Sequence, residues 1–125
     1  MEHSKAFLAL VNAAKKRIAE ISASTTLKTM GRNTGTVVVD VREDSEWNAG
    51  HIAGAIHLGR GIIERDVEIA ISDKDAEIIL YCGGGFRSAL SADNLQKMGY
   101  TNVYSMKGGW RKWNALGYPV TKKRR

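Results

Sequence analysis

The sequence has very few residues that crosslink or interrupt a chain: its 125 residues include one cysteine, Cys82, and one proline, Pro119. A single cysteine cannot form an intrachain disulfide, and it excludes zinc or iron–sulfur sites built from several cysteines. We expect this thiol to stay reduced, as in a cytoplasmic protein. It then either fills space in the core or carries the chemistry.

Long apolar runs are also lacking. No segment approaches the roughly 18 to 20 uninterrupted apolar residues that a membrane-spanning helix needs. The short apolar stretch at residues 6–11 is preceded by Glu2 and followed by Lys15 and Lys16, without a secretory cleavage pattern. We therefore predict a cytoplasmic protein with no membrane partner.

Acidic residues are fewer than basic ones, and the excess of positive charge is concentrated at one end. The 19 lysines and arginines against 13 aspartates and glutamates give a net charge of +6. Four of the cations form the terminal run at residues 122–125, without which the net charge falls to +2. A terminal basic run is typically a solvated tail. We therefore interpret residues 122–125 as a basic tail and predict no nucleic-acid partner.

Apolar residues recur with helical spacing near the start of the chain. Phe7, Val11, Ala14, Ile18 and Ile21 follow one another at intervals of three and four residues, which predicts an amphipathic helix within the first 24 residues. Such a helix could pack on its own domain, form the seam of a dimer or lie on a membrane surface. We favour packing on the domain, and we expect a monomer or a weak homodimer.

The rest of the chain alternates between β-branched runs and segments with helical periodicity. Strands are predicted at residues 37–41, 55–58, 77–81 and 102–106, and helices at residues 43–48, 61–71, 87–98 and 110–116. This order is typical of an α/β domain with a mainly parallel central sheet and helices on both faces. Residues 29–35 have the glycine and asparagine content of a loop. We assign residues 1–32 to the N-terminal helix and loop, and residues 33–121 to the α/β domain.

Cys82 directly follows a predicted strand and opens a glycine-rich loop. Ligands of parallel sheets bind where loops leave the carboxyl ends of the strands. Consecutive glycines allow several backbone N–H groups to turn toward one point, and the next helix directs its positive end there. We therefore predict a stabilised thiolate, against the alternative of an inert buried cysteine before a tight turn. The candidate site comprises Cys82, Gly83, Gly84, Gly85, Phe86, Arg87 and Ser88.

Three separate motifs resemble those of the rhodanese family of single-domain sulfurtransferases. The first is the sequence DVRE at residues 40–43, followed by GHI at residues 50–52. The second is the cysteine loop at residues 82–88, and the third is GGW at residues 108–110 with a further tryptophan, Trp113. The resemblance extends from Val37 to Val120, about 85 of the 125 residues. It implies a rhodanese-like domain of three layers, α/β/α.

The resemblance also implies a reaction. Cys82 would accept a sulfane sulfur from a donor such as thiosulfate, become a persulfide, and pass the sulfur to a thiophilic acceptor such as cyanide or a thiol. Neither a metal nor an organic cofactor is implied. Partners would be small sulfur donors and acceptors, with a sulfur-relay protein as a further candidate. The second interpretation is a sulfur carrier or partner-binding module without turnover of its own.

Two features of the cysteine loop bear on the substrate. Many family members that favour thiosulfate have a basic residue directly after the cysteine, where this sequence has Gly83. Related cysteine phosphatases and arsenate reductases have five residues between cysteine and arginine, whereas four separate Cys82 from Arg87. The shorter loop suits a single sulfur atom better than a tetrahedral oxyanion, so we favour a sulfurtransferase. Phe86 could shield the sulfur from water or present an aromatic face to the acceptor.

Two charged residues at the end of the first predicted strand are candidates for supporting roles. We expect Asp40 to accept hydrogen bonds from the loop or from a neighbouring strand. Arg42 could attract an anionic donor, or it could form an ordinary surface ion pair with Glu43 or Glu46.

Overall fold

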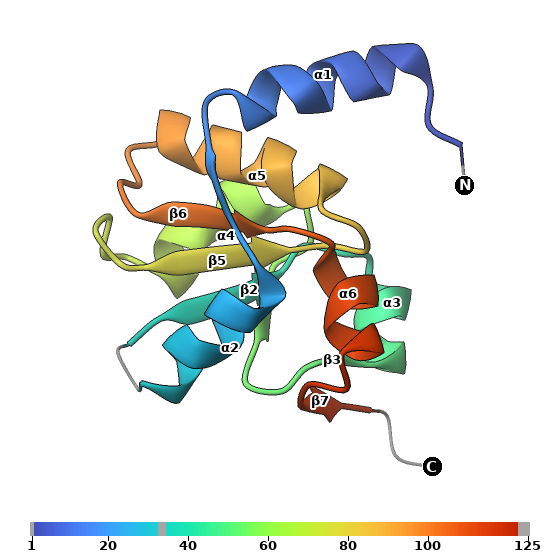
Figure 1. The fold of residues 1–125 in the computed structure, drawn as a ribbon. Helices are drawn as coiled ribbons and strands as arrows, with labels where there is room; N and C mark the ends of the chain where they lie inside the picture. Colours follow the sequence, from blue (N-terminus) through green and yellow to red (C-terminus); the bar gives the residue numbers. More distant parts are fainter. Residues whose placement is uncertain (1, 33–34, 123–125) are drawn as a thin grey trace.

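Strands and helices alternate along the chain in the computed structural model, which describes residues 2–32 and 35–122 (Figure 1). The helices are α1 (Lys5–Lys15), α2 (Ala23–Gly31), α3 (Asp44–Ala49), α4 (Ile63–Ala70), α5 (Phe86–Lys97) and α6 (Gly109–Ala115). The strands are β1 (Ala19–Ile21), β2 (Val37–Asp40), β3 (His51–Ile52), β4 (Ile56–His57), β5 (Ile78–Tyr81), β6 (Val103–Met106) and β7 (Val120–Thr121).

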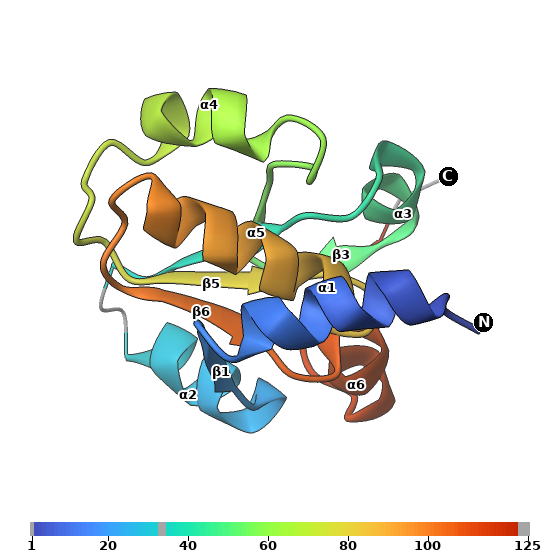
Figure 2. The same cartoon turned by 90° about the horizontal axis from the view of Figure 1, so that it is seen from above.

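The central sheet has five strands in the order β1–β6–β5–β2–β4, and its pairings are all parallel. Side chains of β5 alternate between the two faces: Ile78 and Leu80 pack with residues of α4 and α5, whereas Ile79 packs with Trp113 of α6. Helices α4 and α5 cover one face and α2 and α6 the other (Figures 1 and 2). The predicted α/β/α architecture is therefore confirmed, and burial on both faces explains why the strand sequences are continuously apolar.

Helix α1 forms an additional layer outside α5, the helix against which it packs (Figure 1). Val11 and Ala14 are buried against Ala89 and Leu90 of α5. Beyond the end of the helix, the Arg17 guanidinium donates two hydrogen bonds, of 2.9 and 2.7 Å, to the Asp93 carboxylate of α5. The N-terminal helix thus packs on its own domain, which is the arrangement favoured from the sequence.

The N-terminal helix is shorter than its apolar spacing predicts. It ends at Lys15, so Ile18 and Ile21 do not lie on it, and Ile21 instead belongs to the edge strand β1. The prediction of one helix through these residues was wrong because β1 takes its hydrogen bonds from β6, far away in the sequence. Residues 29–31, predicted as loop, are the last turn of α2. The segment assigned to an N-terminal helix and loop therefore also contributes a strand of the central sheet.

A small antiparallel pair, β3 with β7, was not predicted from the sequence. It joins the chain after α3 to the segment after α6, and these two-residue strands are too short to show a periodic pattern. Within residues 2–32 and 35–122, no helix has the length and apolar character needed to cross a membrane. Of the predicted basic tail, Lys122 is exposed, and residues 123–125 lie outside the described residues.

Candidate active site

Cys82 lies directly after β5, where its side chain is 1% exposed. Its sulfur accepts a hydrogen bond of 3.1 Å from the backbone N–H of Gly85. The Ser88 hydroxyl oxygen is 3.5 Å from the sulfur and 2.8 Å from the hydroxyl of Ser105 on β6. If Ser105 donates to Ser88, the Ser88 proton is free to point at the sulfur. Two donors from the loop and the following helix can therefore stabilise negative charge on this atom.

The loop takes this shape because its carbonyl groups are bound on the opposite side by α6. The carbonyl of Cys82 accepts a 2.7 Å hydrogen bond from the Trp110 N–H, and that of Gly83 accepts one of 3.2 Å from the Arg111 N–H. Gly109 brings these two segments together: its φ is +53°, and a Cβ atom there would overlap the Cys82 carbonyl oxygen. A glycine at position 109 is thus a geometric requirement of the close contact between α6 and the cysteine loop.

Helix α5 begins beside the sulfur. Gly85 is its N-cap residue, with a left-handed φ of +99°, and no side chain caps the first turn. The partial positive charge of a helix N-terminus therefore lies close to Cys82, as the sequence predicts. The sequence predicted that several backbone N–H groups of the loop would point at the sulfur. Among the described loop residues, Gly85 alone donates a backbone hydrogen bond to it.

A cavity of about 430 Å³ opens at Cys82. It is lined by His3, Phe7, Glu46, Cys82, Gly84, Phe86, Arg87 and Arg111. Three of the predicted loop residues, Gly84, Phe86 and Arg87, therefore lie at the cavity together with the cysteine. Sequence reasoning missed the contributions of α1, α3 and α6, because no local pattern indicates that these segments meet there.

The two arginines at the cavity differ in their partners. Arg87 donates hydrogen bonds of 2.8 and 3.2 Å to the carboxylate of Glu46, and this contact raises the pKa of Arg87 and lowers that of Glu46. Arg111 forms no ion pair within the described part of the chain. The positive charge of Arg87 is thus balanced, whereas that of Arg111 is available to an anion.

Asp40 and Arg42 form a buried ion pair, with side chains 0% and 3% exposed. The guanidinium donates to both carboxylate oxygens at 2.8–3.1 Å and to the Gly50 carbonyl at 2.6 Å. Of the two roles considered for Arg42, the surface ion pair with Glu43 or Glu46 is not formed, because the guanidinium is buried against Asp40. Asp40 accepts hydrogen bonds from the Arg42 guanidinium and from the Arg42 backbone N–H.

The ion pair of Asp40 and Arg42 supports the cysteine loop through Trp110. The Arg42 guanidinium lies 4.8 Å from the ring centre of Trp110, whose N–H holds the Cys82 carbonyl. Neither Asp40 nor Arg42 lines the cavity at Cys82. Burial, together with the nearby Asp40 carboxylate, raises the pKa of Tyr81, so its phenol remains protonated. We therefore assign Asp40 and Arg42 a positioning role rather than contact with a substrate.

No cluster of histidine, cysteine, aspartate and glutamate side chains suited to a metal ion is present in residues 2–32 and 35–122. The reactive group that the site itself supplies is the sulfur of Cys82, which is buried, hydrogen-bonded and located at the bottom of a partly apolar cavity.

Comparison with known proteins identifies relatives of the same architecture. The model of the rhodanese-like domain family matches residues 23–116. The thiosulfate sulfurtransferase GlpE of Pseudomonas fluorescens is 39% identical over 89 residues, which cover 71% of this chain and 79% of the relative.

Two solved structures are similar over nearly the whole chain. The polysulfide-sulfur transferase homodimer of Wolinella succinogenes has a TM-score of 0.81 and 28% identity, with 95% of this chain and 88% of that chain covered. A protein of Rhodopseudomonas palustris, called a possible tyrosine phosphatase, has a TM-score of 0.82 and 25% identity, with 97% and 98% covered.

Proposed function

Because the chain belongs to the rhodanese-like domain family, we propose that it is a sulfurtransferase whose Cys82 carries sulfur as a persulfide. The observation that carries this proposal is the Cys82 sulfur itself. It lies at the end of a buried strand, accepts the Gly85 N–H at 3.1 Å and faces a cavity large enough for a donor. A buried sulfur with dedicated donors is suited to hold negative charge.

In the first step the Cys82 thiolate attacks the outer sulfur of thiosulfate. A bond forms between the two sulfur atoms, the sulfur–sulfur bond of the donor breaks, and its electron pair leaves with sulfite. In the second step cyanide or a thiolate attacks the outer persulfide sulfur and regenerates the Cys82 thiolate. No oxidant, metal or cofactor is needed to balance either step.

The same donors serve both states of the cysteine. The Gly85 N–H, the Ser88 hydroxyl and the start of α5 stabilise charge on the thiolate, and the enlarged persulfide extends toward the cavity. A phosphatase reaction is less well supported. Arg87, which would have to bind a phosphate, is held by Glu46, and four residues separate it from Cys82.

The intact mass of the reduced protein tests this proposal. After incubation with thiosulfate we expect a gain of one sulfur atom, which cyanide removes as thiocyanate. The variant Cys82→Ser should gain none while keeping the unfolding temperature of the wild type. A sulfur that the variant also gains would overturn the assignment of Cys82.

Turnover separates the enzyme from a sulfur carrier. An enzyme releases thiocyanate repeatedly from thiosulfate and cyanide, whereas a carrier that was loaded by another protein would discharge once. A wild-type protein that neither thiosulfate, a thiosulfonate nor an organic persulfide can load would contradict the sulfurtransferase proposal.

A further inference from the structure

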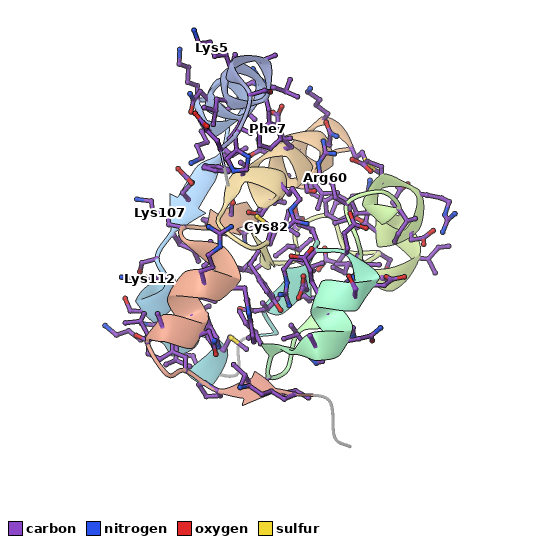
Figure 3. All side chains as sticks on the ribbon, turned by 90° about the vertical axis from the view of Figure 1, so that its right-hand side faces the viewer. Lys5, Phe7, Arg60, Cys82, Lys107 and Lys112 are labelled. Carbon is purple, nitrogen blue, oxygen red and sulfur yellow. The ribbon has the colours of Figure 1, made fainter. Side chains whose placement is uncertain are left out.

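The cavity at Cys82 extends beyond the cysteine loop and is closed on one side by the N-terminal segment. His3 and Phe7 line it, although they precede the part of the chain that matches the rhodanese-like domain, residues 23–116. Figure 3 shows Phe7 on the side of α1 that faces Cys82, whereas Lys5 points away from it. The N-terminal helix therefore contributes to the site as well as to packing.

Three aromatic rings form this wall of the cavity. The His3 ring lies 4.7 Å from the Phe86 ring and 5.1 Å from the Phe7 ring, between ring centres. Phe7 and Phe86 meet edge to face at 6.3 Å. Phe86 opens α5 directly after the loop, so the wall begins four residues from the reacting sulfur. Such rings offer an apolar, polarizable surface to a bound molecule.

The cavity is also lined by one positive charge, that of Arg111, which has no ion-pair partner among the described residues. Arg111 reaches over the glycines of the loop: a Cβ atom on Gly84 would lie 3.5 Å from its Nη1 atom. Arg111 thus places a guanidinium beside a loop whose residue directly after the cysteine, Gly83, is uncharged. The other guanidinium, of Arg87, is neutralised by Glu46.

The size of the cavity fits an organic molecule better than a small inorganic ion. Its volume of about 430 Å³ lies within the roughly 300–1,000 Å³ of typical ligand pockets. Thiosulfate would occupy a small part of it and would leave the aromatic wall in contact with water. A ligand with an apolar body and an anionic end would contact both the rings and Arg111.

Given the proposed sulfurtransferase function, we infer that His3, Phe7 and Phe86 form a specificity wall that selects organic sulfane-sulfur donors with an apolar body, while Arg111 binds their anionic group. An arylthiosulfonate has this chemistry. The Cys82 thiolate attacks its terminal sulfur, a sulfur–sulfur bond forms, the bond to the sulfonyl sulfur breaks, and the electron pair leaves with the arylsulfinate.

Two donors that differ only in their organic body test the wall. Sulfur transfer to cyanide is measured with benzenethiosulfonate and with methanethiosulfonate, and the ratio of their kcat/KM values is compared among variants. We expect the wild type to favour benzenethiosulfonate and Phe7→Ala to lower the ratio about tenfold, mainly through KM. The matched control is Leu10→Ala, on the same helix and 56% exposed outside this cavity, which should keep the wild-type ratio.

Phe7→Leu separates lost selectivity from a displaced helix, because leucine preserves apolar packing on α5 but removes the ring. We expect a ratio between those of the wild type and Phe7→Ala, with wild-type helicity by circular dichroism. Arg111→Gln should raise KM for both donors about fivefold and leave their ratio unchanged. Lys112→Gln is its control, because Lys112 is an exposed cation on the same helix that does not line the cavity.

The outcomes distinguish this inference from the proposed function. If both thiosulfonates load Cys82 but the ratio is the same in the wild type and both Phe7 variants, the specificity wall is refuted and the sulfurtransferase remains. If Arg111→Gln and Lys112→Gln change KM equally, the assigned role of Arg111 is refuted. If no donor loads Cys82 in the wild type, the proposed function itself fails.

Discussion

Two neighbouring parallel strands end in arginine–carboxylate pairs, and the two pairs have different surroundings. Strand β2 leads to Asp40 and Arg42, which are almost fully buried, with every carboxylate and guanidinium contact directed into the protein. Strand β5 leads through the cysteine loop to Arg87, whose pair with Glu46 is 31% and 36% exposed at the edge of the cavity.

The same pair of charges can stabilise the fold in one place and belong to the site in another. Removal of one member of a buried pair leaves the other charge without solvent or a partner, which costs several kcal/mol. When an exposed pair is broken, water solvates the remaining charge, so the pair contributes little to the free energy of unfolding. Burial, which the sequence does not reveal, therefore decides which arginine supports the fold and which one lies at the cavity.

The largest effect should come from breaking the buried pair. We expect Asp40→Asn to lower the free energy of unfolding by about 3–5 kcal/mol, because Arg42 would keep its charge in the interior without a counterion. Denaturant unfolding followed by circular dichroism measures this. Glu46→Gln serves as the matched substitution in the exposed pair, and equal losses in the two variants would contradict the distinction.

The next effect concerns the contact between the cysteine loop and α6. We expect Gly109→Ala to cost about 1–3 kcal/mol for the left-handed φ and to displace the Cys82 carbonyl, so that persulfide formation slows at least tenfold. Gly117→Ala is the control, because Gly117 has a φ of +71° and a Cβ atom there would meet open space. It should lose stability without slowing persulfide formation. Equal rates in the two variants would show that the contact does not shape the loop.

The donor from Ser88 should have a smaller effect. We expect Ser88→Ala to slow persulfide formation about tenfold, because its hydroxyl lies 3.5 Å from the Cys82 sulfur. Ser91→Ala changes a buried hydroxyl of the same helix that has no hydrogen-bond partner among the described residues. Single-turnover loading with thiosulfate compares the variants, and a loss shared by both would point to altered packing of α5 instead.

The smallest effect should come from the exposed pair, and it should depend on pH. The hydrogen bond from Arg87 lowers the pKa of Glu46. A lowered pKa stabilises the folded state above the carboxyl's unfolded pKa, and this stabilisation is lost as the pH falls through the folded value. Glu46→Gln should therefore cost less than about 1 kcal/mol at neutral pH. Unfolding at acid pH should show no difference from the wild type, and a difference that grows in acid would reverse the assignment.

Most of the fold could be predicted because its signals are local. The alternation of apolar strands and periodic helices identified β2, β4, β5, β6 and the helices that follow them, to within a few residues at each end. Helix α2 was missed, and residues 29–31 at its end were predicted as loop. The edge strand β1 and the pair β3–β7 were missed as well. Their partners are distant in the sequence, and strands of two or three residues are too short to show a period.

The candidate nucleophile and its loop can be identified from the sequence alone, because one cysteine, three glycines and the start of a helix stand next to one another in the chain. The side chains that surround them could not be identified in this way. Arg42 turns inward to Asp40, Arg111 comes from α6, and Phe7 comes from a helix that packs on α5. These contacts join segments that are remote in sequence, so their geometry arises only when the elements pack together.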